Sequence, residues 1–139
     1  MYSKFNKLKS SVIGLVLLMI LILAVPQSVR GDDVMLLIGG WRSTVEVPGG
    51  LRINETILQA NGIFSQIIIQ GPYTRYISGT YKAAAGFIQF KPIDWSPRVD
   101  AQGSPIGAAP WGASYRIVDQ NHIQFFDASG KSEMAVRIQ

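Results

Sequence analysis

The sequence predicts an all-β fold: a single small eight-stranded antiparallel up-and-down β-barrel that follows an N-terminal signal peptide or anchor helix. Three observations lead to this prediction. From Asp32 onward, no segment keeps a helical period of apolar residues for more than two turns. Short runs rich in Ile, Val, Phe, Tyr and Thr recur instead, and Gly, Pro, Asn and Asp break them, as is typical of strands and turns. All but one of the breaks are short, so successive strands should pair antiparallel, and closure into a barrel removes both exposed edges.

The first 31 residues differ from the rest in composition. Three lysines precede an unbroken apolar run, Val12–Val25, which Pro26 ends. This run is shorter than the roughly 20 residues that a bilayer-spanning helix requires, so it is typical of a signal peptide. The residues Val29–Gly31 suit cleavage before Asp32, and an uncleaved membrane anchor is the alternative. Both interpretations predict an exported protein, periplasmic or extracellular, that meets a membrane only through this segment.

Residues 32–139 are predicted to form one domain without net charge. The chain has 139 residues and a formal net charge of +4, but four of its 13 Lys and Arg residues and none of its nine Asp and Glu residues lie in residues 1–31. The neutral remainder gives no electrostatic reason to bind nucleic acid. The chain has no cysteine and one histidine, which excludes disulfides, thiolate chemistry and zinc sites built from Cys and His. We expect no cofactor and no metal.

Eight candidate strands follow one another, and turn residues bound each of them. Asn61-Gly62 is the strongest hairpin signal, because both residues tolerate positive φ. The other turn segments are Pro48–Gly50, Gly71-Pro72, Ala83–Gly86, Asp119–Asn121 and Asp127–Gly130. The predicted strands are Leu36–Val47, Leu51–Ala60, Ile63–Gln70, Tyr73–Lys82, Gly86–Ile93, Ser114–Val118, His122–Phe126 and Ser132–Ile138.

The alternation of side chains assigns an inner face to five of these strands. The residues assigned inward are Ile77, Gly79 and Tyr81, then Ile88 and Phe90, Tyr115 and Ile117, Ile123 and Phe125, and finally Met134, Val136 and Ile138. In the last strand this assignment places Ala135 and Arg137 outside.

The register of residues 51–60 against 63–70 stays open, because Ile67-Ile68-Ile69 is apolar on both faces. A two-residue loop at Asn61-Gly62 puts Ile67 and Ile69 inside. A longer loop shifts the register by one residue and puts Phe64 and Ile68 inside.

Several short motifs resemble those of lipocalin-like (calycin) proteins, especially the small bacterial exported ones. Gly39-Gly40-Trp41 resembles their Gly-x-Trp motif, Ala60–Phe64 their Asp/Asn-Gly-Thr-Phe hairpin, and Ile77–Tyr81 their Ser-Gly-Thr-Tyr strand. In calycins a basic residue on the last strand packs across the motif tryptophan, and Arg137 is the matching residue here. The resemblance therefore implies a lipocalin-like barrel in which Gly39, Trp41 and Arg137 are structural-motif residues.

The aromatic side chains assigned inward have two interpretations. Trp41 could stack on a ligand at the barrel mouth, but the motif favours a plug at the closed end beneath Arg137. Tyr81, Phe90, Tyr115 and Phe125 either fill the core or line a pocket in which tyrosine hydroxyls orient a ligand.

Charged residues and one long connection supply the remaining candidates. Glu55 and Arg75 lie mid-strand in apolar stretches, so they either pair inside the barrel or lie exposed outside it. Residues 94–113 form the one long connection, and Trp95 and Trp111 within it could cover the barrel mouth, anchor a protein partner or pack onto the barrel. His122 has no partner for catalysis in the sequence and is expected on the outer face.

These observations lead to two hypotheses of function. The first is an exported binding protein that holds a small apolar or amphipathic ligand, with Tyr81, Tyr115, Arg75, Trp95 and Trp111 as candidate ligand-binding residues. The second is an envelope protein-interaction or inhibitor module that uses the 94–113 loop, with a filled barrel as scaffold. An enzyme is not expected, because the sequence contains no convergent set of titratable residues. An interior void above roughly 300 Å³, lined by Tyr81 or Tyr115, would favour the first hypothesis.

Overall fold

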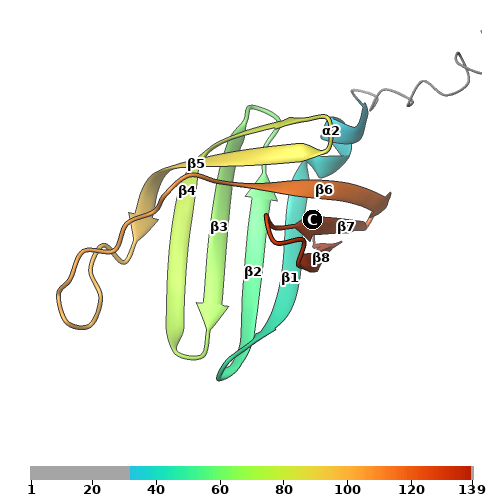
Figure 1. The fold of residues 1–139 in the computed structure, drawn as a ribbon. Coiled ribbons are helices and arrows are strands. Elements are labelled where there is room, and N and C mark those ends of the chain that lie inside the picture. Colours follow the sequence, from blue (N-terminus) through green and yellow to red (C-terminus); the bar gives the residue numbers. More distant parts are fainter. Residues whose placement is uncertain (1–31, 139) are drawn as a thin grey trace, which may run out of the picture. The chain divides into compact units, whose positions relative to one another are not determined.

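The computed structural model describes residues 32–138, which form a closed barrel of eight antiparallel strands in sequential order (Figure 1). The predicted fold class is confirmed. The strands are β1 (Gly39–Val47), β2 (Gly50–Leu58), β3 (Ile63–Gln70), β4 (Tyr73–Ala84), β5 (Phe87–Ser96), β6 (Trp111–Asp119), β7 (His122–Phe126) and β8 (Ser132–Arg137). The predicted signal peptide or anchor, residues 1–31, lies outside the described residues. Between residues 32 and 138, no helix has the length and apolar character needed to span a membrane.

The start of the domain differs from the prediction. The strand expected from Leu36 begins at Gly39, and a short helix, α2 (Asp32–Leu37), precedes it. The Leu37 side chain is fully buried in the core, and its carbonyl oxygen accepts a hydrogen bond from the Trp41 indole Nε1 at 2.7 Å. This helix therefore covers the end of the barrel, a tertiary role that the local sequence does not reveal.

The hairpin between β2 and β3 settles the register that the sequence left open. The Gln59 amide donates to the Ile63 carbonyl at 2.9 Å, and the Gly62 amide donates to the Gln59 carbonyl at 3.1 Å. Gly62 has φ of 80°, which places it in the left-handed region that glycine adopts without strain. The loop therefore has three residues and ends in a glycine bulge, so Leu58 lies opposite Phe64.

This register confirms the alternative with the longer loop. Phe64 is fully buried, and Ile68 lines the barrel interior. Ile67 and Ile69 take the opposite face, because successive side chains of a strand point to opposite sides of the sheet. The other fully buried large side chains are Leu37, Leu58, Ile88 and Ile123, which mark the centre of the core.

The inward assignments in β4, β5, β6 and β7 are confirmed, whereas the assignment in β8 is wrong. Met134 and Val136 are both 44% exposed, and Ala135 is buried. Antiparallel partners share a face, and Ala135 lies opposite Ser43, which is buried inside the barrel. The inner face of β8 therefore comprises Glu133, Ala135 and Arg137. Hydrophobicity misled the prediction, because both charged residues on this face have polar partners.

Arg137 closes the barrel at the end where α2 lies. Its guanidinium carbon lies 4.2 Å from the centroid of the Trp41 ring, and Trp41 is only 2% exposed. The same guanidinium donates to the carbonyl oxygens of Leu36 at 2.8 Å and Ile38 at 2.9 Å. Trp41 therefore lies at the closed end, and any opening for a ligand is at the opposite end.

The long connection is shorter than the sequence predicted, because β5 continues to Ser96 and β6 begins at Trp111. Trp95 and Trp111 therefore lie on strands, and the loop comprises residues 97–110. In Figure 1 this loop extends away from the strands beyond the end of β5. Strand β5 pairs with β6 only from Phe87 to Phe90, which leaves the far half of β5 to pair with β4 alone.

Candidate functional site

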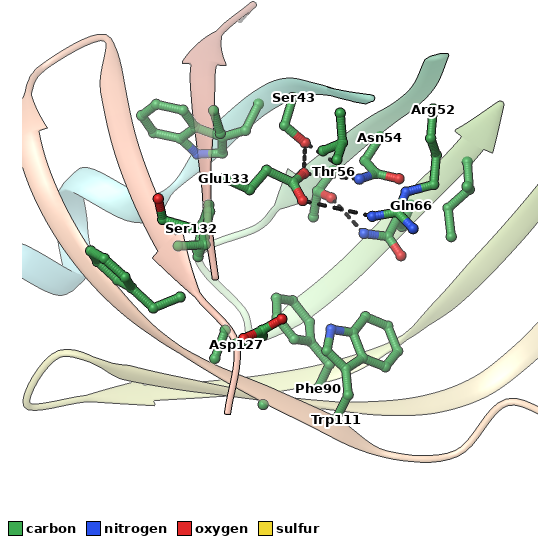
Figure 2. A pocket seen from close by; sticks show the side chains of 18 of the residues that line it. Ser43, Arg52, Asn54, Thr56, Gln66, Phe90, Trp111, Asp127, Ser132 and Glu133 are labelled. Carbon is green, nitrogen blue, oxygen red and sulfur yellow. Dashed lines mark hydrogen bonds and ion pairs between the residues drawn. The ribbon is translucent and has the colours of Figure 1, made fainter. Parts of the chain in front are cut away.

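A cavity of about 570 Å³ occupies the barrel interior and has two unlike walls (Figure 2). Polar side chains from β1, β2, β3 and β8 gather on one side, and aromatic side chains from β5 and β6 lie across from them. The volume exceeds the roughly 300 Å³ that the binding hypothesis requires. The lining that the hypothesis named is wrong, because neither Tyr81 nor Tyr115 borders this cavity.

The polar wall centres on the carboxylate of Glu133. Its Oε1 accepts hydrogen bonds from the Ser43 hydroxyl and from the Asn54 amide nitrogen, the latter at 2.9 Å. Ser43 is buried, and it reaches Glu133 because β8 pairs with β1. Beside this group, the Gln66 amide nitrogen donates to the Thr56 hydroxyl at 3.0 Å. Four strands thus hold a hydrogen-bonded polar cluster inside an otherwise apolar barrel.

Arg52 is also part of the polar wall, but not all of its N–H groups have hydrogen-bond partners there. Its Nη2 lies 3.9 Å from the Glu133 Oε2, which is beyond hydrogen-bond distance. Its Nε is buried and has no hydrogen-bond partner in the described structure. Since a buried atom presents no surface to the cavity, the donor that Arg52 offers to a ligand is its Nη2, which faces the Glu133 Oε2.

The aromatic wall is a packed cluster. The Phe90 and Trp111 rings stack at a centroid distance of 4.8 Å, and Phe64 meets both rings edge-on at 5.0 and 5.5 Å. Such pairs stabilise a core beyond the area that they bury. The cluster fixes the orientation of Trp111, so it gives the cavity a rigid apolar surface.

The open end of the cavity lies at the hairpin between β7 and β8. Asp127 Oδ1 accepts hydrogen bonds from the amide and hydroxyl of Ser129 and from the amide of Lys131, at 2.6–3.0 Å. The hydrogen bond from the Ser129 hydroxyl holds the pKa of Asp127 below its usual value. This carboxylate is therefore engaged in shaping the hairpin, whereas Lys131 lines the cavity entrance as an exposed cation.

Of the five candidate ligand-binding residues, the structure places only Trp111 in the cavity. Tyr81 is buried, and its hydroxyl donates to the Gln59 carbonyl at 2.6 Å. Burial raises the pKa of the Tyr81 phenol above its ordinary value. Tyr115 is buried in the core on β6. Both tyrosines pack in the core at the closed half of the barrel.

Arg75 and Trp95 hold the 97–110 loop instead of contacting the cavity. The Arg75 Nη2 donates to the Gly107 carbonyl at 2.5 Å. The Trp95 Nε1 donates to the Ile106 carbonyl at 2.7 Å, and the Arg98 guanidinium carbon lies 4.1 Å from the centroid of the Trp95 ring. Of the open interpretations, these contacts favour tryptophan rings that pack onto the barrel and hold residues 106 and 107, while the rest of the loop extends away from the strands.

Of the two interpretations left open for Glu55 and Arg75, the structure excludes an inward pair, since Glu55 pairs with Arg42 and Arg75 bonds to Gly107. Glu55 accepts from Arg42 Nη2 at 2.6 Å, and the two side chains are 29% and 52% exposed. Because β1 and β2 align Arg42 opposite Glu55, this is an exposed cross-strand pair on the outer face. His122 lies beside Asp119 at the turn before β7, with Nδ1 at 2.8 Å from the carboxylate. The hydrogen bond from the Asn121 amide, and after it the one with His122, lowers the pKa of Asp119.

The polar-wall residues that the sequence reasoning missed are Ser43, Arg52, Asn54, Thr56, Gln66 and Glu133. One signal could have found Glu133. The resemblance placed Arg137 inside across Trp41, and the two-residue period of a strand then places Glu133 inside as well. Hydrophobicity alone predicts the opposite face.

Comparisons with known proteins do not assign a family. No protein-family model matches the chain, and no curated protein is similar enough to it to count as a relative. The fold and the site therefore define only a class, that of small antiparallel β-barrels with an interior cavity, which is consistent with a lipocalin-like architecture.

Proposed function

We propose that this protein is an exported binding protein that holds one small amphipathic molecule inside its barrel and does not catalyse a reaction on it. The observation that carries the proposal is the cavity of about 570 Å³ with a polar wall around Glu133 and an aromatic wall of Phe90 and Trp111. Ligand sites of roughly 300–1,000 Å³ commonly combine an apolar surface with a few placed polar groups. Export is supported by the basic and apolar residues that precede residue 32.

The same geometry weakens the interaction-module hypothesis. That hypothesis requires a filled barrel and tryptophans that are free to contact a partner. Trp111 is stacked on Phe90, and the Trp95 indole nitrogen is hydrogen-bonded to Ile106 of the same chain. The binding hypothesis has no such conflict, because Trp111 contributes its remaining surface to the cavity.

A cavity-filling variant tests the proposal. N-phenyl-1-naphthylamine is a neutral probe whose fluorescence rises in apolar surroundings, and we expect saturable binding to the wild-type protein. Ala113 borders the cavity on β6, so Ala113→Phe should fill part of it and weaken probe binding about tenfold or more. The matched control is Ala84→Phe, because Ala84 is exposed on β4 and does not border the cavity.

The two variants also separate binding in the cavity from binding to residues 1–31, which are the same in both proteins. Circular dichroism establishes that each variant is folded. If Ala113→Phe binds the probe as tightly as Ala84→Phe does, the cavity is not the binding site and the proposal fails. Native mass spectrometry of the purified protein adds a direct search for a co-purifying small molecule, which the Ala113→Phe protein should lack.

A further inference from the structure

The polar wall holds two opposite charges, those of Arg52 and Glu133, which face each other without forming a hydrogen bond. The Glu133 Oε1 accepts hydrogen bonds from Ser43 and Asn54, whereas among residues 32–138 the charged group nearest to Oε2 is the Arg52 Nη2 at 3.9 Å. Figure 2 shows these groups side by side across the cavity from Phe90 and Trp111. The wall therefore offers one acceptor, the Glu133 Oε2, and one donor, the Arg52 Nη2, to a group that lies between them.

The separation of 3.9 Å fits one bridging oxygen atom. An oxygen about 2.9 Å from an N–H nitrogen and about 2.7 Å from a carboxylate oxygen satisfies both groups, because these are ordinary hydrogen-bond lengths. The three distances close a triangle with an angle near 90° at the bridging atom. A hydroxyl group meets the requirement with one atom, since it accepts from Arg52 and donates to Glu133.

Charged groups fit this place less well. A carboxylate bound to Arg52 would lie within a few ångströms of Glu133 Oε2, and an ammonium bound to Glu133 would lie equally close to Arg52. Like charges at that separation repel strongly in a partly buried site. A group that only accepts, such as an ether oxygen, would leave Oε2 facing a lone pair.

We propose that the ligand is an alcohol: its hydroxyl bridges Arg52 and Glu133, and its apolar part lies against Phe90 and Trp111. This inference rests on the proposed function and adds the chemical class of the ligand. A water molecule at the same place would use the same hydrogen bonds, so the test must show that the hydroxyl of the ligand itself contributes to affinity.

Four probes with similar chains make that test: 1-octanol, its isomer 1-methoxyheptane, octanoate and octylammonium. Each is titrated in competition with N-phenyl-1-naphthylamine on the purified wild-type protein. We expect 1-octanol to bind about tenfold more tightly than each of the other three. The comparison between 1-octanol and 1-methoxyheptane needs no variant, so a folding defect cannot affect it.

Substitution of Glu133 should change the order of the affinities of the four probes. In Glu133→Gln the amide oxygen can still accept from Ser43 and Asn54, which turns the amide nitrogen toward Arg52. Two donors then face the cavity, so octanoate should gain at least tenfold relative to 1-octanol. Glu55→Gln removes the same charge from the outer face and should leave the order unchanged, because Glu55 pairs with Arg42 away from the cavity.

The outcomes separate the two levels of the argument. If 1-methoxyheptane or either charged probe binds the wild-type protein as tightly as 1-octanol, the alcohol inference is wrong, whereas binding in the cavity stands. The inference is also wrong if folded Glu133→Gln keeps the wild-type order. If none of the four probes competes and Ala113→Phe does not affect the naphthylamine, the proposed function itself is wrong.

Discussion

Removing the guanidinium of Arg137 should destabilise the barrel more than removing any exposed arginine. Arg137 donates to three carbonyl oxygens, those of Leu36 at 2.8 Å, Ile38 at 2.9 Å and Gln120 at 2.7 Å. It also covers the ring of Trp41 at 4.2 Å. One side chain therefore joins β8 to the segment before β1 and to the turn before β7. In Arg137→Met these carbonyls lose their charged donor.

The size of the effect follows from these contacts. Hydrogen bonds to charged groups contribute about 1.5–3 kcal/mol each, and a cation–π contact about 0.5–2 kcal/mol. The contributions of one side chain are not additive, and the bond to Gln120 is exposed. We therefore expect Arg137→Met to lower the free energy of unfolding by about 3 kcal/mol. For a domain of this size, that corresponds to a Tm decrease of roughly 12–24 °C.

Urea unfolding, followed by tryptophan fluorescence and circular dichroism, measures this change. Arg42→Met is the matched control, because Arg42 is 52% exposed and makes a single surface ion pair with Glu55. Such pairs contribute at most about 1 kcal/mol. Arg137→Lys keeps the charge without the planar fork, so it should fall between the two. Equal stability of Arg137→Met and Arg42→Met would refute the role of Arg137 as the closing residue.

Two further predictions concern single side chains. Gly79→Ala should lower the free energy of unfolding, measured in urea, by about 2 kcal/mol or more, because the new Cβ would overlap the backbone carbonyl of Lys91 at the β4–β5 bulge. Gly107 has open space around it, so the control Gly107→Ala should change the free energy of unfolding by less than about 0.5 kcal/mol. Tyr81→Phe should cost about 1 kcal/mol at pH 7, because it leaves the Gln59 carbonyl without its donor. Burial raises the pKa of Tyr81 in the folded protein above 10.0, so this tyrosine loses its proton at a lower pH in the unfolded chain. The free energy of unfolding of the wild type should therefore fall as pH rises past about 10, and it should fall by more than that of Tyr81→Phe. Parallel curves of stability against pH for the two proteins would contradict this.

The parts of the fold that the sequence predicts well are those that local patterns determine. Strands β4 to β7 have apolar residues at every second position, so their inner faces follow directly. Short turns join β4 to β5 and β6 to β7, so the pairing within each of these hairpins follows as well. Closure of the sheet into a barrel is also predictable, because an open sheet of eight strands would leave two edge strands exposed.

The site was harder to predict, because its polar residues are inside for reasons that only the assembled barrel supplies. Glu133 is tolerated there because Ser43 and Asn54, which are 90 and 79 residues away in sequence, donate to it. Trp95 and Trp111 looked like loop residues because Pro and Gly surround them, yet long-range pairing extends β5 and β6 to include them. The periodicity of hydrophobic residues reveals neither these long-range hydrogen bonds nor this long-range strand pairing.

The β2–β3 loop links local sequence to the site, because the residue that pairs with Ile63 decides which side chains of β3 line the cavity. The native three-residue loop, Ala60–Gly62, pairs Gln59 with Ile63 and turns Gln66 and Ile68 inward. Deletion of Ala60 leaves Asn61-Gly62, which forms a two-residue turn readily and joins the same pair, so the register is retained. We therefore expect this deletion to change the free energy of unfolding by less than about 1 kcal/mol and to preserve naphthylamine binding. Insertion of one glycine after Ala60, by contrast, allows either a longer loop with the native register or a shifted register that turns Ile67 inward. Because the shifted register changes the cavity lining, this insertion should weaken naphthylamine binding. If the deletion abolishes binding while the barrel stays folded, loop length does more than set the register, and the link from this hairpin to the polar wall is wrong.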